Sequence, residues 1–459
     1  MSTTEQDVRP ASRLRAVEAR LVAFAVLLTA GAAALLALSE TTEPPVEALI
    51  YPGALAVAAV FAHAAVRYAA PNADPLLLPL TILLNGIGLV FVRRIDLVRG
   101  SELGTAQTMW TLVSIAVLCA VILFIRRVDA LSAYQYTFGL ATLVLLLLPL
   151  VPGLTAGIIN GAQLWIRIGP MTFQPGELAK VTLVLFLAGY LERKRALLSV
   201  ATQRVGPVLL PAARHLAPLL LATGVALVIM AGLRDLGSAL LFFGAFVGLL
   251  YVATGRLAYP AIGGITFAVG SFVVYHLFGH VRVRFRIWLD PWERVSDEGY
   301  QIAQSLFALG TGGLTGTGLG FGRPQDIPFS ETDAIFSVIG EELGLLGATA
   351  VLLAFVLLIA RGFKIALTAR DEFGTLLATG LTIIVGLQTF VIIGGLTRLV
   401  PLTGITLPFI SYGGSSLLAN YIIIALLLRI SHESRGGASR PRQRPESTRP
   451  RHGEREAVT

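Results

Sequence analysis

The chain has 459 residues, of which 55% are hydrophobic and only 14% are charged, and its mean hydropathy is +0.74. Soluble domains carry about a quarter charged residues, so this composition excludes an ordinary soluble protein and indicates a polytopic membrane protein. The net charge of +8 does not indicate nucleic-acid binding, because the arginines stand at the ends of apolar runs and in the C-terminal tail. Arginines in such places orient the chain in the membrane and contact anionic lipid.

Apolar runs of spanning length recur along the chain and predict an all-α protein with about twelve transmembrane helices, since a bilayer core takes about 20 residues. They lie near 20–38, 50–69, 75–93, 107–125, 132–151, 175–192, 215–231, 236–254, 257–278, 333–361, 373–398 and 406–430. The polar residues 1–19 predict a cytoplasmic N-terminal segment. The tail 431–459, rich in Arg, Pro, Ser and Glu, predicts a disordered basic cytoplasmic segment because it cannot bury enough apolar surface to order itself.

The basic residues at the ends of these runs predict the orientation of the chain. Those expected on the cytoplasmic side are Arg126, Arg127, Arg193, Lys194, Arg195, Arg361, Lys364 and Arg429. Because cytoplasmic loops carry an excess of Lys and Arg, this pattern places both termini in the cytoplasm, with the pair Arg93 and Arg94 as the exception. The loops 152–174 and 280–332 then face outward on the same side, where chemistry cannot use cytosolic nucleotides directly.

Cysteine and histidine usage argues against a built-in metal site. The single cysteine, Cys119, lies in an apolar run, which excludes an intramolecular disulfide and a cysteine-cluster site. The six histidines are scattered without HxxxH or HExxH spacing, which argues against a zinc site.

Polar clusters interrupt the apolar sequence, and ionisable groups at membrane depth mark functional or structural pairing. In the first cluster, Arg167 precedes a helix start at Pro175, and Glu177 and Lys180 are i, i+3 neighbours on one helix face. An ion pair that pins the helix start and a role in lining a site both remain open. In the second cluster, Asp235 is a candidate helix cap or substrate contact.

The long loop 280–332 carries the third cluster. Its segment from Gly299 to Gly310 has apolar residues at helical spacing, with Gln301 and Gln304 on it, and predicts an amphipathic helix at the membrane surface. The glycine-rich run 310–322 fits either a backbone cradle for phosphate or a flexible turn, with the turn favoured. Three carboxylates, Asp333, Glu341 and Glu342, then stand at or near the start of the next span.

The fourth cluster surrounds Arg398, which stands between glycines and Pro401 and is followed by Ser411. A broken helix at membrane depth is tolerated where it lines a cavity, and a guanidinium is a permanently charged fork of donors suited to phosphate. The clusters together predict an outward-facing cavity with arginines, carboxylates and apolar walls. Its ligand would have an anionic head, hydroxyls and an apolar tail, as in a lipid-linked phosphate or pyrophosphate.

Several motifs resemble the FtsW/RodA/SpoVE (SEDS) family. They are NGAQLWIRIGPMTFQPGELAK, RDLGSALL, GYQIAQSLFALGTGG, ETDAIFSVIGEELG and GGLTRLVPLTGITLPFISYGGSS. The last motif resembles RodA-like, particularly actinobacterial, members. The resemblance covers about residues 75–430 and implies a ten-helix SEDS core there, preceded by two extra transmembrane helices at 20–70.

The resemblance implies a peptidoglycan glycosyltransferase of the bacterial cytoplasmic membrane. It would polymerise lipid II onto a lipid-linked glycan chain outside the membrane, with a class B penicillin-binding protein as transpeptidase partner, in elongation, division or sporulation. It implies no certain cofactor, although a divalent cation (Mg or Mn) could bridge pyrophosphate oxygens. The alternatives are a lipid II flippase and an inactive scaffold for the transpeptidase.

The sequence departs from the family pattern at one place that concerns catalysis. Arg294 occupies the position of the family's essential aspartate, which leaves Asp297 and Asp290 as candidate bases. Asp297 is favoured because it is nearer the predicted helix after Gly299, and Arg294 is expected to pair with a neighbouring glutamate or to hold a phosphate.

The remaining candidates are assigned to substrate binding. Cationic groups would stabilise the departing lipid pyrophosphate, and polar groups would hold the sugars. The candidate substrate-binding residues are Arg167, Glu177, Lys180, Asp235, Gln301, Gln304, Asp333, Glu341, Arg398 and Ser411.

Overall fold

The computed structural model describes residues 11–40, 49–159, 161–169, 171–199, 203–205, 208–210 and 213–436. The helices are α1 (Ala11–Glu40), α2 (Ile50–Ala69), α3 (Leu77–Arg99), α4 (Leu103–Phe124), α5 (Gln135–Leu147), α6 (Pro175–Ser199), α7 (Ala213–Gly232), α8 (Leu236–Thr254), α9 (Ala258–Leu277), α10 (Gly279–Leu289), α11 (Tyr300–Gly312), α12 (Ile335–Leu367), α13 (Glu372–Leu396) and α14 (Gly414–Gly436). Short 3-10 helices are η2 (Asp129–Tyr134), η3 (Leu148–Leu150), η4 (Trp292–Arg294) and η5 (Pro324–Asp326). The strands β1 (Ile166–Ile168), β2 (Met171–Phe173), β3 (Gln203–Val205) and β4 (Val208–Leu210) form two antiparallel hairpins.

The protein is an all-α polytopic membrane protein, as the sequence predicts. Ten helical segments of the described residues are long and apolar enough to cross a membrane. The two remaining predicted runs are the helices α6 and α7. In α6 charged side chains stand on both sides of the apolar stretch, at Glu177 and Lys180 and again at 192–195. The apolar part of α7 is shorter, at Ala217–Gly232.

Two helix ends differ from the sequence prediction. The first helix begins at Ala11, inside the segment predicted to be polar, and its Arg15 and Glu18 are buried. The last helix continues to Gly436, where Arg435 pairs with the buried Asp74 at 3.0 Å. Paired charges can be buried in a helical core, which hydropathy alone does not detect. The predictions for residues 1–10, for Asn160 and for residues 437–459 fall outside the described residues.

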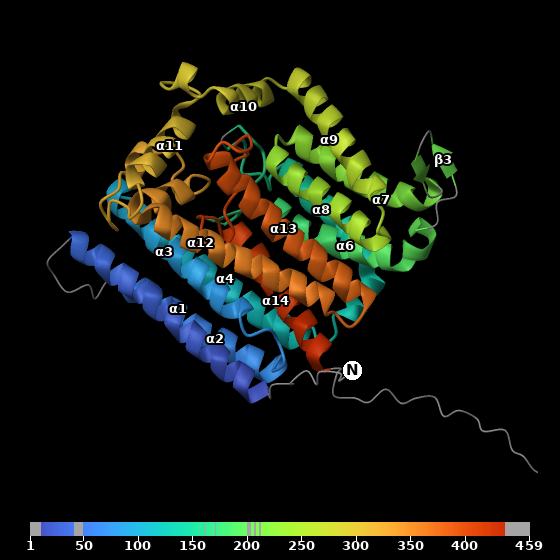
Figure 1. The fold of residues 1–459 in the computed structure, drawn as a ribbon, viewed down its shortest axis with the longest axis horizontal. Coiled ribbons are helices and arrows are strands. Elements are labelled where there is room, and N and C mark those ends of the chain that lie inside the picture. The colour runs from blue at the N-terminus through green and yellow to red at the C-terminus, as the bar shows by residue number, and fades with distance from the viewer. Residues whose placement is uncertain are drawn as a thin grey trace, which may run out of the picture.

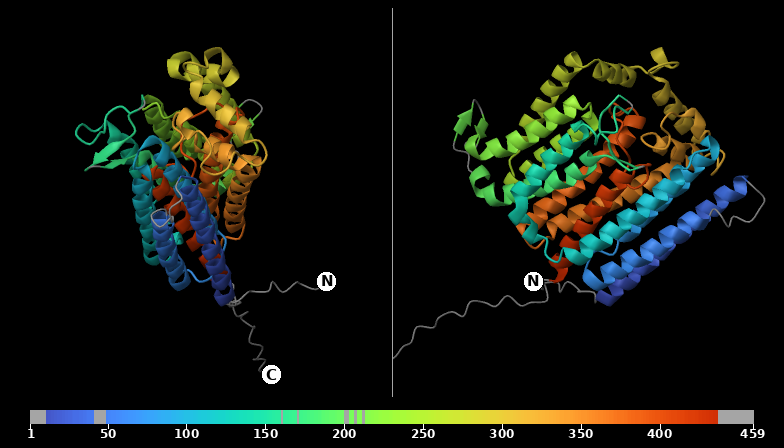
Figure 2. Two further views of the ribbon diagram at one scale, coloured as in Figure 1. Left: turned by 90° about the vertical axis from the view of Figure 1, so that its left-hand side faces the viewer. Right: turned by 180° about the vertical axis from the view of Figure 1, so that it is seen from behind.

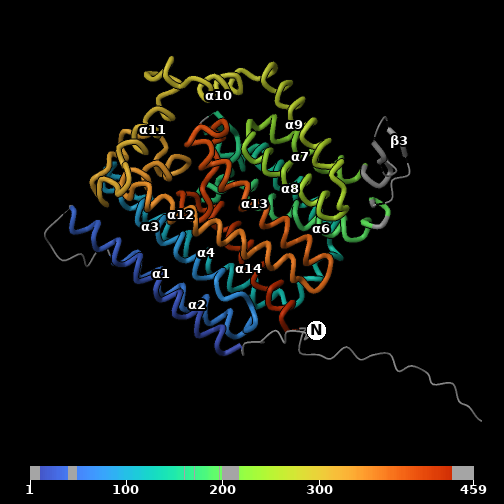
Figure 3. The backbone as a smooth tube through the Cα atoms, viewed as in Figure 1, coloured from blue at the N-terminus to red at the C-terminus, as the bar shows by residue number. Residues whose placement is uncertain are grey.

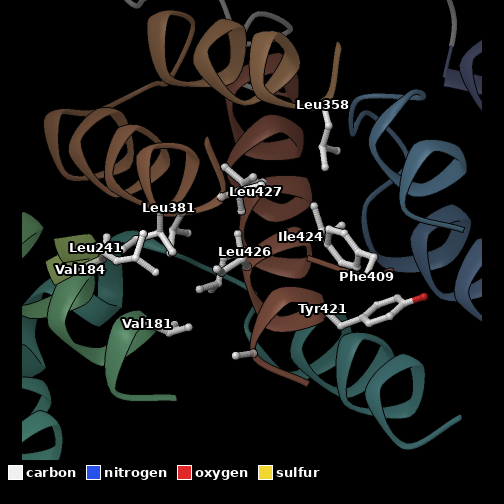
Figure 4. Packing of buried hydrophobic residues seen from close by; sticks show 14 of the residues in the cluster. Val181, Val184, Leu241, Leu358, Leu381, Phe409, Tyr421, Ile424, Leu426 and Leu427 are labelled. Atoms are coloured by element: carbon white, nitrogen blue, oxygen red, sulfur yellow. The ribbon is translucent and has the colours of Figure 1, made fainter. Parts of the chain in front are cut away.

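The helices form one bundle around α14, whose spanning stretch is largely buried. Leu426 and Leu427 of α14 meet Leu381 of α13, and Tyr421 packs edge-on against Phe409 (Figure 4). The peripheral helices keep many exposed leucines, because apolar side chains are satisfied by lipid as well as by protein. The start of α1 and the end of α14 lie at one end of the bundle, and α10 lies at the other (Figures 1 and 2).

The two N-terminal helices pack on the outside of α3 and α4 (Figure 1). A Cβ at Gly86 of α3 would meet the Thr29 hydroxyl of α1 at 2.0 Å, so this close approach requires glycine. Near the start of α1, the Glu18 carboxylate pairs with Arg15, and its Oε1 lies 2.8 Å from Nδ1 of His63. These contacts join α1 to α2, and Arg15 also donates to the Ala73 carbonyl just before α3, which attaches the extension to the core.

An arch formed by α9, α10 and α11 (residues 258–312) crosses the end of the bundle opposite the start of α1 and the end of α14 (Figure 3). The amphipathic helix predicted from Gly299 is confirmed as α11, whereas α10 was not predicted. The segment before α14 (residues 397–413, the return loop) passes beneath α10. The arch and the return loop together build the functional region.

Candidate functional site

A small cavity of about 130 Å³ lies where the arch meets the return loop. It is lined by Arg284, Ile287, Glu298, Gln301, Ile302, Asp333, Leu402 and Gly404. The charged and amide side chains come from α10, the turn before α11, α11 itself and the segment before α12. Three aliphatic side chains complete the lining, so the cavity combines one cation, two carboxylates and an apolar wall.

Arg284 supplies the cation. Its Nη1 donates a 2.9 Å hydrogen bond to the Thr403 carbonyl, which attaches α10 to the return loop. Gly404 has a φ of +71°, and a Cβ there would lie 3.8 Å from Arg284 Nη2 and 3.9 Å from Asp333 Oδ2. Burial lowers the pKa of Arg284, and the charges of Asp333 and Asp235 oppose that shift. Because arginine titrates far above neutral pH, Arg284 stays charged and gives the cavity a fixed positive group.

Asp333 faces Arg284 across Gly404 and is held on both carboxylate oxygens. Gln301 Nε2 donates to Oδ2 at 3.2 Å, and Thr332 Oγ1 donates to Oδ1 at 3.0 Å. Burial raises the pKa of Asp333, and the two donors act against that shift. The structure therefore brings together two predicted site residues, Gln301 and Asp333.

Glu298 is the second carboxylate of the cavity. Its Oε2 accepts a 3.0 Å hydrogen bond from Arg294 Nη1, so the expected pairing of Arg294 with a neighbouring glutamate is found. The candidate bases Asp290 and Asp297 are both exposed, and neither is among the side chains that line the cavity. Asp290 instead accepts the backbone N–H of Trp292 at 3.0 Å.

A second polar group is buried beside α6. Glu177 and Lys180 form the predicted i, i+3 ion pair at 2.7 Å, and Lys180 Nζ donates to Gln388 Oε1 at 3.0 Å. Gln388 in turn donates to the Thr406 carbonyl of the return loop at 2.7 Å. Asp235 caps α8 by accepting the Ser238 N–H at 3.0 Å, as one of the two sequence interpretations expected. This group connects the return loop to α6 and α13.

Arg398 lies elsewhere than the sequence analysis expected. Its guanidinium donates to the main-chain carbonyls of Trp288, at 3.1 Å, and Leu289, at 2.8 Å, and Trp288 Nε1 donates back to the Arg398 carbonyl at 3.0 Å. These carbonyls end α10 and have no intrahelical donor. Arg398 therefore holds the end of α10 and does not line the cavity among the described residues.

The glycine-rich run also differs from a phosphate cradle. The amides of Gly320 and Gly322 donate to the carboxylate of Glu342 at 3.0 and 3.3 Å, and Arg94 pairs with the same carboxylate at 2.9 Å. The neighbouring Glu341 accepts a hydrogen bond from the Arg323 N–H at 3.1 Å, so both glutamates hold this loop against α12. Arg94 is only 4% exposed, so it is a packing residue, which explains why it violates the orientation pattern.

Three further candidates have other positions. Ser411 is buried, donates to the Thr332 carbonyl at 2.5 Å and so fixes the residue beside Asp333. Gln304 is half-buried on α11, and Arg167 is exposed on β1 opposite Thr172.

Among the described residues, no three His, Cys, Asp or Glu side chains gather as potential metal ligands.

Of the eight residues that line the cavity, the sequence analysis assigned only Gln301 and Asp333 to the site, and it missed Arg284, Glu298 and Gly404 together with the three aliphatic residues. A local signal is present for Arg284, which stands three residues before Ile287, the spacing of one helix face. Glu298 lies in the turn before α11 and has no such signal. The position of Gly404 depends on a fold contact and has no local signal.

The chain is similar to known membrane proteins over most of its length. Residues 75–436 match the FtsW/RodA/SpoVE family model, described as "Cell cycle protein". A "Peptidoglycan glycosyltransferase RodA" of Mycobacterium tuberculosis is 42% identical over 96% of this chain and 95% of its own length. The protein of the same description from Mycobacterium leprae is 44% identical over 85% of this chain and 83% of its own length.

A solved structure described as "Structural coordination of polymerization and crosslinking by a peptidoglycan synthase complex" is also similar. It aligns with a TM-score of 0.55 and 28% identity, over 84% of this chain and 97% of that one. The family match, the relatives and the shared helical architecture agree with the motifs of the sequence. The chain therefore belongs to the FtsW/RodA/SpoVE family.

Proposed function

We propose that this protein is a peptidoglycan glycosyltransferase that polymerises lipid II into glycan strands at the bacterial cytoplasmic membrane. The observation that carries the proposal is the cavity at the arch end of the bundle, where Arg284, Glu298, Gln301 and Asp333 converge. Curated relatives that are 42% and 44% identical to this chain over the aligned residues are described as peptidoglycan glycosyltransferases, which supports the same activity here.

The cavity has the groups that glycosyl transfer from a lipid pyrophosphate requires. Joining two sugars needs a base for the acceptor hydroxyl and positive charge for the departing pyrophosphate. Arg284 would stabilise the pyrophosphate, and a carboxylate would act on the hydroxyl. Gln301 and Asp333 would position the sugars. The cavity is smaller than the roughly 300 Å³ of an ordinary ligand site, so we expect the arch to move outward when lipid II binds.

A divalent cation is compatible with these residues. Mg²⁺ in such sites commonly takes one or two carboxylates and completes its shell with substrate phosphates and water. Asp333 would be its ligand from this chain, in place of the hydrogen bond from Gln301 or Thr332, and the pyrophosphate would provide others. The cation would supply positive charge to the leaving group, in addition to that of Arg284.

We also propose a class B penicillin-binding protein as the partner that cross-links the new strand. Support comes from the similar solved structure, which is described as a complex for polymerisation and crosslinking. The cavity would face outward with both termini in the cytoplasm. This orientation is supported by the basic residues at the predicted inner ends and by the position of α10 opposite the described ends of the chain (Figure 2).

The test is a polymerisation assay on purified protein with labelled lipid II, alone and with the candidate transpeptidase. We expect glycan strands in at least one of the two reactions. Transport of lipid II across vesicles without polymer would instead favour the flippase. Neither activity, together with retained binding of the transpeptidase, would favour the inactive scaffold.

A further inference from the structure

We propose that Glu298 is the catalytic base that removes the proton from the acceptor sugar hydroxyl. This inference rests on the proposed glycosyltransferase function and assigns a role within the same cavity. It concerns a side chain that the sequence analysis considered only as a partner of Arg294.

The first argument is position. A general base must come within about 3 Å of the proton that it abstracts, so reach is decided before pKa. Four acids stand in the segment between α10 and α11: Asp290, Glu293, Asp297 and Glu298. Glu298 is the member of this set that lines the cavity. All four acids are exposed, so the distinction is that the other three do not line the cavity, and Asp290 is turned back onto the Trp292 N–H.

The second argument separates Glu298 from Asp333, the other carboxylate of the cavity. Asp333 has both oxygens occupied by side-chain donors, from Gln301 and Thr332. Glu298 is held through Oε2 by Arg294, whereas its Oε1 makes no hydrogen bond within the described part of the chain. An oxygen without a donor is available to an incoming hydroxyl. Its side chain also keeps 31% exposure, which leaves it accessible to an acceptor.

The third argument is the arrangement of charge. Arg294 holds Glu298 in the turn before α11, and Arg284 stands on a different element, α10, with its Nη2 3.8 Å from where a Cβ at Gly404 would lie. The cavity therefore presents a carboxylate with a free oxygen and a separate guanidinium. Acceptor activation and leaving-group stabilisation need such a separation, because one group receives a proton while the other meets negative charge.

The resulting step is balanced. Glu298 accepts the proton of the acceptor hydroxyl while the oxygen of that hydroxyl forms a bond to the anomeric carbon of the donor sugar. The bond from that carbon to the lipid pyrophosphate breaks, and the pyrophosphate leaves with the electron pair beside Arg284. Glu298 then returns its proton to the released pyrophosphate or to water.

The experiment compares Glu298→Gln with Glu293→Gln, the same chemical change on an exposed residue of the same segment. Polymerisation of labelled lipid II is measured together with lipid II binding. We expect Glu298→Gln to lower kcat by about 100-fold or more, the usual scale for a lost general base, with binding changed by no more than about twofold. Glu293→Gln should polymerise normally.

Two further variants separate a chemical role from a structural one. Arg294→Gln breaks the same ion pair but keeps the carboxylate, so we expect a loss of less than about tenfold. An equal loss in Arg294→Gln and Glu298→Gln would mean that only the ion pair matters, and would overturn the proposal. A large loss in Asp297→Asn, with turnover retained in Glu298→Gln, would overturn it in favour of Asp297.

The failure of the inference is distinguishable from failure of the proposed function. If the unmodified protein forms no glycan from lipid II, alone or with its partner, the glycosyltransferase function is wrong and this role for Glu298 falls with it. If the unmodified protein and Glu298→Gln polymerise at similar rates, the function stands and only the assignment of Glu298 is wrong.

Discussion

At the residue scale, the two arginines Arg284 and Arg398 show how one side-chain type serves two purposes. Arg284 uses one donor on the Thr403 carbonyl and keeps its remaining charge at the cavity. Arg398 donates hydrogen bonds to the two carbonyls that end α10. The difference follows from where each Cα lies relative to a helix end, since exposed C-terminal carbonyls attract any nearby cation.

Arg284→Ala should lower kcat/KM for lipid II polymerisation by about 100-fold, because one preorganised donor to a developing anion is commonly worth that much. Arg286→Ala is the matched control, since Arg286 is exposed on the same helix and is not among the cavity residues. Steady-state polymerisation at several lipid II concentrations is the measurement. Equal effects of the two substitutions would show that Arg284 contributes only general positive charge.

Asp333 gives a prediction for stability against pH. Because its pKa is raised in the folded protein, the folded state binds the proton more tightly than the unfolded state does. The free energy of unfolding should therefore fall, relative to that of Asp333→Asn, as the pH rises from the ordinary aspartate pKa of about 4 through the raised pKa of the folded protein. Thermal unfolding of both proteins across that range measures the difference. A difference that does not vary with pH would contradict the assignment.

At the element scale, the arch depends on a few polar contacts because α9 and α10 bury little surface. The spanning stretch of α9 is only 6% buried. α10 is attached to the return loop through Arg284, Trp288 and Arg398. The glycine-rich loop after α11 is attached to α12 through Glu342. These contacts determine how easily the cavity opens.

Arg398→Ala should abolish or strongly reduce activity while leaving the protein folded, because α10 loses its attachment and the cavity loses its geometry. Hydrogen exchange over residues 279–289 should become faster in the variant. Arg282→Ala, on the exposed side of α10, is the control. Near-normal turnover in Arg398→Ala would mean that the other contacts of α10 suffice.

Arg94→Ala should destabilise the protein by about 3 kcal/mol, because removing the cation of a buried pair leaves the Glu342 charge, among the described residues, with only the Gly320 and Gly322 amides. Arg93→Ala is the neighbouring control, since Arg93 makes a cation–π contact with Tyr51 at 5.5 Å, a kind of contact worth about 1 kcal/mol. Thermal unfolding in detergent measures both variants. Similar shifts would rule out a special role for the buried pair.

At the scale of the whole molecule, the bundle has two chemically different ends. One end gathers the described start of α1, the end of α14 and Asp74, which binds Arg361 and Arg435. The other end carries the arch, the return loop and the cavity (Figure 1). This separation is what an enzyme needs if it takes a lipid-linked substrate on one face of a membrane only.

A topology reporter inserted after Lys194 should report the cytoplasm, and one inserted near Gln325 should report the outside. Lys194 stands beside Arg193, which donates to the Ser132 carbonyl, and beside Arg195, which pairs with Glu372 at the start of α13. Gln325 lies in η5, in the loop between α11 and α12. The opposite result at either position would overturn the orientation.

The sequence by itself determined the membrane class, the position of nearly every spanning helix and the amphipathic α11. The cap at Asp235 and the pairing of Glu177 with Lys180 were each one of two interpretations that the sequence left open. Each depends on residues within a few positions of one another, so local periodicity and composition suffice. Only the tertiary structure decided that Arg284 lines the cavity while Arg398 caps α10, and that the amides of Gly320 and Gly322 are taken by Glu342. These outcomes depend on contacts between segments far apart, such as the one joining Trp288 to Arg398 across 110 positions. The side chain that reaches the cavity is set by how the arch lies on the return loop, and no local pattern encodes that.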